Sequence, residues 1–176
     1  FHHLFPDCAG DAVEISTTIT QLAKEYFDFP KSSQWQIINE DIRDYFPHCQ
    51  QKYDLIIIDI AVEKLTPEWL VDRDFLQQCR TVLTDNGHVA FNFLVKDSNA
   101  FMHYLSNVRS VFERQTVCLS LPSYRNIVIL AFNQTPPFLP NNVSSRLDDL
   151  DKKWGLEFSK FYQQMLKDNP NDSGIF

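Results

Sequence analysis

The chain has 176 residues, a net charge of −7 and an apolar content of 44%, and this length suits one domain with its own core, since domains usually hold roughly 100–200 residues. The acidic balance and the lack of a dense Lys/Arg cluster argue against a nucleic-acid substrate, and no apolar run approaches the ~20 residues of a membrane helix. We therefore expect a small neutral or cationic molecule as the partner, with neither nucleic acid nor a membrane involved.

The first third of the chain alternates between strand-like and helix-like segments. It begins FHHLFPDC, without Met, and reads as the tail of a helix entering a turn, so we expect further sequence upstream. Ser16 is a suitable N-cap for the helix that follows, and Pro47 is expected to end a later, shorter one. The expected elements are strands at residues 12–15, 35–38 and 55–58, with helices over residues 16–27 and around residues 44–46.

The rest of the chain continues this alternation and then changes. A helix is expected from about residue 73 to residue 83, and Asn86-Gly87 is a C-cap signal after it. A strand at 88–93 and a helix at 99–112 follow. The strands at 116–121 and 126–132 are linked too closely for a crossover helix, so they should form an antiparallel hairpin. We therefore predict an α/β fold with a mostly parallel sheet and a terminal hairpin.

A proline-rich break divides this domain from a tail. Pro136, Pro137 and Pro140 interrupt the pattern, and residues 144–167 then repeat apolar residues at helical spacing. The predicted division is a Rossmann-like domain over residues 1–134 and a linker with an amphipathic helix over residues 135–176. Trp154 and the other aromatic residues of this helix are expected to pack in the core or at a homodimer interface.

Three acidic residues lie at the ends of three successive strand-like runs. Glu14 closes AVEI, Asp41 follows WQIINE and Asp59 closes YDLIIID. In an alternating strand–helix chain these ends share one edge of the sheet, where open α/β sheets bind ligands. Three carboxylates suit a ligand with hydroxyl donors, amine donors or positive charge. The pattern predicts a nucleoside-type cofactor in a transferase and leaves the transferred group open.

Each acid also has a structural interpretation. Glu14 is alternatively an exposed strand end, and Asp41, in EDIRD, is alternatively a helix N-cap. Asp59 follows four apolar residues and needs a partner or a cleft; a structural role would pair it with Arg43 or with a helix N-terminus.

The cysteines and histidines indicate neither disulfides nor metal. The four cysteines are far apart and form no CxxC pair, which is simplest in a reduced, cytoplasmic chain. The five histidines lack the spacing of metal ligands.

Several motifs together resemble one family. In order they are AVEIS…LAKEYF, EDIRDYF, YDLIIID, FLQQCRTVLTDNGHVAFN and LPSYRNIVILAF, and they cover about residues 4–133. This order and spacing resemble the spermidine synthase (aminopropyltransferase) family of the class I S-adenosylmethionine-dependent methyltransferase superfamily. The resemblance implies a Rossmann-like fold, a transferase and S-adenosylmethionine or its decarboxylated form as cofactor.

The resemblance also implies a role for each residue. Glu14 is expected to accept hydrogen bonds from the ribose hydroxyls, and Asp41 from the adenine amino group. Asp59 matches the acid that serves as general base on the attacking amine and helps to hold the cofactor's cationic groups. Tyr124, in Pro-Ser-Tyr, matches a tyrosine that lines the pocket of the small amine acceptor.

Two departures leave the reaction open. The family's glycine-rich loop is absent from a chain with only four glycines, and we expect it upstream. Val62 stands where the family has a second Asp, and Glu63 is only an approximate substitute as a substrate-binding acid. The alternatives are therefore a small-molecule methyltransferase, or a catalytically inactive descendant that binds nucleosides or regulates a partner.

Overall fold

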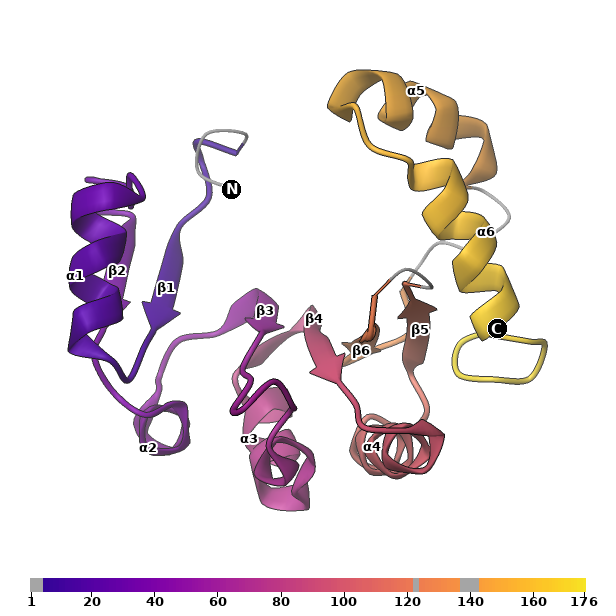
Figure 1. Ribbon diagram of the computed structural model, residues 1–176, viewed down its shortest axis with the longest axis horizontal. Helices are drawn as coiled ribbons and strands as arrows, with labels where there is room; N and C mark the ends of the chain where they lie inside the picture. The colour runs from indigo at the N-terminus through magenta and orange to yellow at the C-terminus, as the bar shows by residue number, and fades with distance from the viewer. Residues whose placement is uncertain (1–4, 122–123, 137–142) are drawn as a thin grey trace. The chain divides into compact units, whose positions relative to one another are not determined.

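The computed structural model describes residues 5–121, 124–136 and 143–176 (Figure 1). By their internal contacts the residues form two compact units, an N-terminal unit (Phe1–Gln50) and a C-terminal unit (Gln51–Phe176).

The N-terminal unit is built on two parallel strands. Its elements are β1 (Gly10–Val13), α1 (Thr17–Tyr26), β2 (Trp35–Ile38) and α2 (Ile42–His48). The side chain of Ser16 caps α1 as predicted, by accepting a hydrogen bond from the backbone N–H of Ile19 at 3.3 Å. The Trp35 ring occupies the space that a side chain at Gly10 would need. Pro47 was expected to end α2, but the helix runs one residue further.

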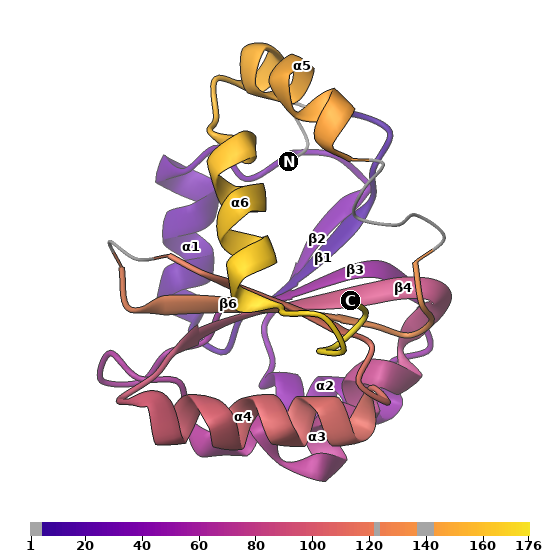
Figure 2. The same ribbon diagram turned by 90° about the vertical axis from the view of Figure 1, so that its right-hand side faces the viewer.

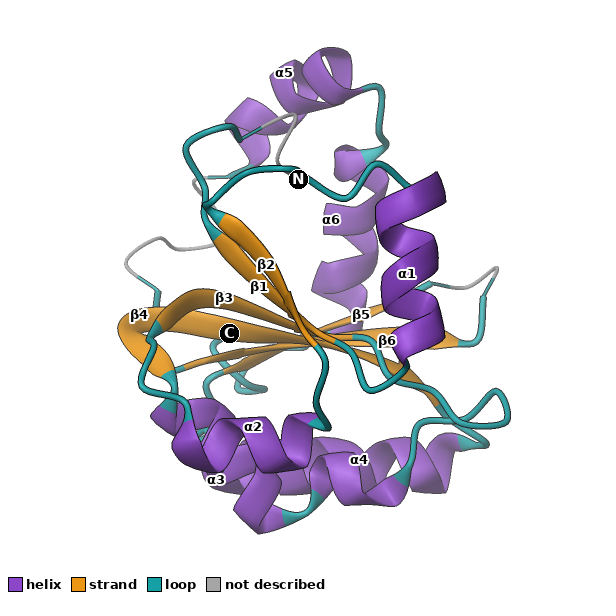
Figure 3. Ribbon diagram, turned by 90° about the vertical axis from the view of Figure 1, so that its left-hand side faces the viewer, coloured by secondary structure: helices purple, strands orange, loops and turns teal. Residues whose placement is uncertain are grey.

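The C-terminal unit is a four-stranded sheet with helices on both faces. Its elements are β3 (Tyr53–Ile58), the 3-10 helix η1 (Glu68–Val71), α3 (Arg73–Thr81), β4 (Leu83–Leu94), α4 (Ser98–Val111), β5 (Thr116–Ser120), β6 (Asn126–Phe132), α5 (Ser144–Trp154) and α6 (Phe158–Asp168). The strand order is β3-β4-β6-β5. Strands β3 and β4 are parallel, whereas β6 is antiparallel to both of its neighbours. Figures 2 and 3 show α3 and α4 on one face of this sheet and α6 on the other.

Alternation along β4 gives the sheet its two different faces. Val89, Phe91 and Phe93 are almost fully buried, and the ring of Phe93 meets Tyr104 of α4 edge-on at 5.3 Å. The intervening residues, including His88 and Asn92, are only partly buried and belong to the opposite face. The odd positions therefore form the core under α3 and α4, and the even positions lie on the opposite face.

Asn86-Gly87 does not cap a helix, although the sequence predicts it as a C-cap signal. Helix α3 already stops at Thr81, and both residues lie inside β4. There the register with β3 shifts, so that Tyr53 pairs with Leu83 but Leu55 pairs with His88. A side chain at Gly87 would lie 2.7 Å from the Tyr53 carbonyl oxygen. The glycine is required by a close approach of two strands and not by a helix cap.

The tail forms two helices where the sequence predicts one. Gly155 adopts a left-handed conformation, with φ of 64°, and caps the C-terminus of α5. Glycine takes this conformation without steric cost, and α6 then starts in a new direction. In the same unit, α6 is fixed to β5 because the backbone N–H groups of Cys118 and Ser120 donate to the side-chain oxygens of Asn169 and Asp168.

Candidate functional site

Glu14 is held at the carboxyl end of β1. Its backbone N–H donates to the Ile38 carbonyl at 3.0 Å, and its own carbonyl accepts from the Asn39 side chain at 2.8 Å. The side-chain oxygen Oε1 accepts from the backbone N–H of Ser16 at 2.7 Å. Within the described residues Oε2 has no donor, so one carboxylate oxygen is oriented and the other remains available to a ligand.

Asp41 caps α2 and is bound by Arg43. Its Oδ1 accepts from the backbone N–H of Arg43 at 2.9 Å, and the Arg43 guanidinium donates to Oδ2 at 2.6 Å. These hydrogen bonds favour the charged carboxylate and lower the pKa of Asp41. The N-cap interpretation is therefore confirmed. The predicted contact with adenine stays a prediction, and it competes with Arg43 for the same oxygens.

Asp59 directly follows β3 and is bound to the neighbouring strand. The side-chain amide of Asn92 in β4 donates to Asp59 Oδ1 at 2.8 Å. The Asn92 Oδ1 in turn accepts from the side-chain amide of Asn126, the first residue of β6, at 2.9 Å. The partner of Asp59 in this unit is thus an amide on the adjacent strand. That Asp59 shares one site with Glu14 and Asp41 stays a prediction.

Sequence reasoning missed Asn92 and Asn126. The available signal was the string Phe-Asn-Phe, because asparagine is depleted in strands and a polar group in a sheet needs a partner. Asn92 is placed next to Asp59 by the parallel register, in which Ile58 pairs with Phe91. The register itself depends on the shift near Gly87, which the sequence pattern does not reveal.

The loop after Asp59 turns back tightly over residues 62–65. Val62 and Leu65 exchange two backbone hydrogen bonds, of 2.8 and 3.0 Å. Glu63 and Lys64 between them both have positive φ, of 51° and 67°, as a type I′ turn requires. Val62 is 58% exposed. Glu63 therefore lies at the tip of a narrow turn, where its role as a substrate-binding acid stays a prediction.

Residue Thr66 anchors the end of this loop to the sheet. Its N–H donates to the Leu94 carbonyl at 3.0 Å, and its hydroxyl accepts from the Leu94 N–H at 2.8 Å. The buried hydroxyl of Tyr104 donates to the Thr66 carbonyl at 2.9 Å. The end of the loop that leads into η1 is therefore fixed to β4 and α4.

Tyr124 is 72% exposed, at the start of the bend before β6. Such exposure does not fit packing of the Tyr124 side chain inside the hairpin. Its predicted place in an amine pocket stays a prediction.

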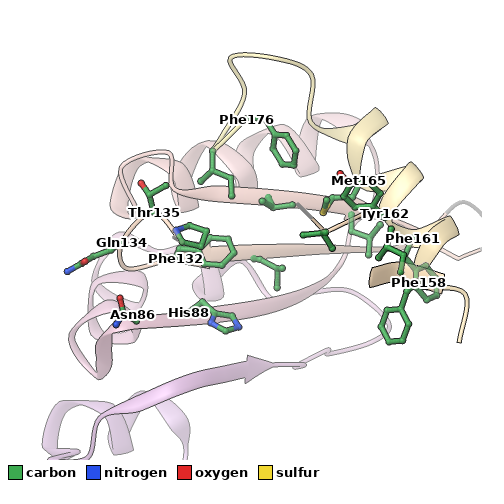
Figure 4. Close-up of a pocket in the computed structure, with 17 residues that line it drawn as sticks. Asn86, His88, Phe132, Gln134, Thr135, Phe158, Phe161, Tyr162, Met165 and Phe176 are labelled. Atoms are coloured by element: carbon green, nitrogen blue, oxygen red, sulfur yellow. The ribbon is translucent and has the colours of Figure 1, made fainter. Parts of the chain in front are cut away.

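A cavity of about 440 Å³ lies between the sheet and α6 (Figure 4). None of its lining residues is charged, and most are apolar, among them Leu130, Phe158 and Met165. His88 lies in its wall and stacks on Phe132, with ring centroids 5.5 Å apart. Because no Asp or Glu side chain lines it, this cavity does not suit a cationic amine.

Within residues 5–121, 124–136 and 143–176, no group of His, Cys, Asp or Glu is arranged to hold a metal ion. In the same ranges no helix has the length and apolar character to cross a membrane.

Comparison with known proteins places these features in a family. Residues 9–137 match the spermine/spermidine synthase domain. The polyamine aminopropyltransferase of Chromobacterium violaceum is 25% identical over 171 residues, covering 96% of this chain and 65% of that protein. The human eEF1A lysine and N-terminal methyltransferase is 27% identical over 123 residues, covering 63% of this chain and 18% of that protein. The chain thus spans just under two thirds of the bacterial relative.

Solved structures confirm the fold. A probable spermidine synthase from Corynebacterium glutamicum has a TM-score of 0.72 and 22% identity, covering 85% of this chain and 57% of that one. Human methyltransferase-like protein 13, solved with SAH, has a TM-score of 0.71 and 20% identity, covering 94% of this chain and 73% of that one. The predicted class I methyltransferase fold is therefore confirmed, and the chain belongs to the spermine/spermidine synthase domain family.

Proposed function

We propose that this protein is a transferase that uses S-adenosylmethionine or its decarboxylated form and moves an aminopropyl group to a small amine. The observation that carries the proposal is the carboxylate of Asp59 at the end of β3. Its Oδ1 is held by Asn92 at 2.8 Å, and its Oδ2 has no hydrogen-bond partner within the described residues. Such an acid is oriented, and one of its oxygens is free to accept a proton.

The nucleoside would be bound by the N-terminal unit. Glu14 fits this role, since Oε1 is fixed by the Ser16 N–H at 2.7 Å and Oε2 is left to accept from a ribose hydroxyl. Asp41 fits it less directly, because the Arg43 backbone and guanidinium already donate to both of its oxygens. An adenine amino group would have to replace one of the Arg43 hydrogen bonds.

Asp59 supplies the base that amine transfer requires. A bound sulfonium donor provides an electrophilic carbon, to which the amine nitrogen bonds as the carbon–sulfur bond breaks and its electron pair passes to sulfur. The amine then carries one proton too many. Asp59 Oδ2 accepts this proton. General-base catalysis of this kind typically accelerates a reaction by about 10²–10⁴-fold. Asp59 does not need to move for this, because Asn92 fixes its other oxygen.

Methyl transfer is the second candidate, and Val62 favours it. A diamine acceptor is best held by a carboxylate near each ammonium group. Val62 stands where the second acid is expected, and its backbone N–H and carbonyl groups hydrogen-bond to those of Leu65. An acceptor with a single amine, or with none, needs no second acid. The fold is compatible with both reactions.

Calorimetric titration with S-adenosylmethionine, its decarboxylated form and methylthioadenosine tests the proposal. Binding of the decarboxylated form at least tenfold tighter than S-adenosylmethionine is expected for aminopropyl transfer. The reverse preference would favour methyl transfer. If none of the three binds, the transferase proposal fails and a non-catalytic role takes its place.

A further inference from the structure

We propose that Asn92 and Asn126 position the Asp59 carboxylate, so that Oδ2 is the oxygen that accepts the proton from the acceptor amine. This inference rests on the proposed function. All three residues belong to the C-terminal unit, and each is on a different segment: directly after β3, near the C-terminal end of β4 and at the start of β6.

The hydrogen bonds can run in only one direction. An ionised carboxylate has acceptors and no donor, so Asn92 must present its NH₂ group to Asp59, at 2.8 Å. The carbonyl end of the Asn92 amide then faces Asn126, which must donate to it, at 2.9 Å. Asn126 thus prevents the Asn92 amide from turning over. The orientation of Asp59 is set by two amides, of which only the nearer one contacts it.

The register of the sheet supports this arrangement. Ile57 and Ile58 pair with Ala90 and Phe91, so the next residues along both strands, Asp59 and Asn92, come side by side. In the antiparallel pair, Asn92 lies opposite Val128 and Asn126 lies opposite Leu94. Asn92 and Asn126 are therefore diagonal neighbours on one face of the sheet, within reach of each other.

A neutral donor suits a base better than a cation does. A lysine or arginine at this position would stabilise the carboxylate strongly and would also repel a cationic donor or acceptor. An amide restrains one oxygen with a single hydrogen bond and adds no charge. We therefore assign Asn92 a positioning role, because it acts through Asp59 and not on the substrate.

The first test does not depend on activity. In a ¹⁵N-labelled 176-residue chain, the side-chain amide signal of Asn92 should show one proton protected from exchange with solvent. Asn126→Asp replaces the donor by an acceptor of the same shape, and should shift the Asn92 amide signal and remove this protection. Asn99→Leu, at an exposed position of α4, is the control and should leave the signal in place. An Asn92 signal that is unprotected in the wild type, or unmoved by Asn126→Asp, would overturn the proposal.

The second test is a double-mutant cycle on transfer rate. Asn92→Leu should lower kcat by about tenfold or more, as expected for a hydrogen bond to a charged group, with little change in KM for the nucleoside. In an Asp59→Asn background the same substitution should change kcat by less than about twofold, because the two residues act as one unit. Equal effects in both backgrounds would overturn the positioning role while leaving the transferase proposal intact.

The two proposals can therefore fail separately. If the wild type transfers no group to any amine but the Asn92 signal behaves as expected, the proposed function fails and the arrangement of the three side chains stands. If transfer occurs and the cycle is additive, the function stands and the role of Asn92 fails.

Discussion

The side chain of Asn169 pairs with the backbone of Cys118 as a neighbouring strand would. The Cys118 N–H donates to Asn169 Oδ1 at 2.8 Å, and Asn169 Nδ2 donates to the Cys118 carbonyl at 2.6 Å. Strand β5 is an edge strand of the four-stranded sheet, and Asn169 is 2% exposed just after α6. The pairing satisfies part of an open sheet edge and fixes α6 to it.

Asn169→Ala should therefore destabilise the protein by about 2–4 kcal/mol, because it leaves a buried N–H and a buried carbonyl without partners. Urea unfolding measures this change. Asn171→Ala, at an exposed position two residues further on, is the matched control and should stay within about 0.5 kcal/mol of the wild type. A loss below 1 kcal/mol for Asn169→Ala would mean that the pairing contributes little.

The free energy of unfolding should decrease at acidic pH because His88 is partly buried. Burial of the imidazole lowers the pKa of His88, and the nearby charge of Asp54 opposes this only in part. The unfolded state therefore binds more protons than the folded state once the pH drops below about 6.5. The free energy of unfolding keeps its full value above this pH and decreases as the pH falls below it. His88→Phe should reduce the slope of unfolding free energy between pH 7 and pH 5. His103→Phe, at an exposed position, should not, and equal slopes for both variants would contradict the account.

The four cysteines should react in two classes. All are free; Cys79 and Cys118 are buried, and burial raises the pKa of both thiols, that of Cys118 to about 11. Because the thiolate is the reactive form, a thiol reagent should modify only Cys8 and Cys49 in the folded protein. Cys79 and Cys118 should react on unfolding in urea. Modification of all four at one rate in native buffer would show that the core opens easily.

Glu14 should determine affinity for the nucleoside. Glu14→Gln keeps the shape of the side chain but replaces the charged acceptor of the ribose hydroxyl, so we expect dissociation constants about 10–100 times larger. Glu25→Gln, on the exposed surface of α1, is the control for loss of one negative charge. Unchanged affinity in Glu14→Gln would remove Glu14 from the cofactor site.

Local patterns predicted most of the fold. Strands β2 and β6 begin and end where the apolar runs do, and the short link to β6 correctly indicated an antiparallel hairpin. The errors arise where long-range contacts override local signals. Asn86-Gly87 resembles a helix end, yet Gly87 is needed where β4 passes close to the Tyr53 carbonyl. The break at Gly155 was missed because apolar spacing continues across it.

The candidate site was predictable only in part. Glu14, Asp41 and Asp59 follow their strands as the acidic pattern suggests, and the motif order identified the family. Asn92 could not be assigned from its own neighbourhood, because its role depends on which residue of β3 lies beside it. The partner of Asp41 was also open, since a residue that caps a helix and one that contacts a nucleoside have the same local sequence.

The rate of aminopropyl transfer by Asp59→Asn, compared with the wild type, decides whether Asp59 acts as the base. The substitution preserves shape and removes the proton acceptor, so single-turnover transfer from decarboxylated S-adenosylmethionine to a diamine should slow by about 10²–10⁴. The affinity for methylthioadenosine, which has no cationic group, should stay nearly unchanged. Transfer at the wild-type rate in Asp59→Asn would show that Asp59 is not the base, and would contradict the mechanism proposed for this site.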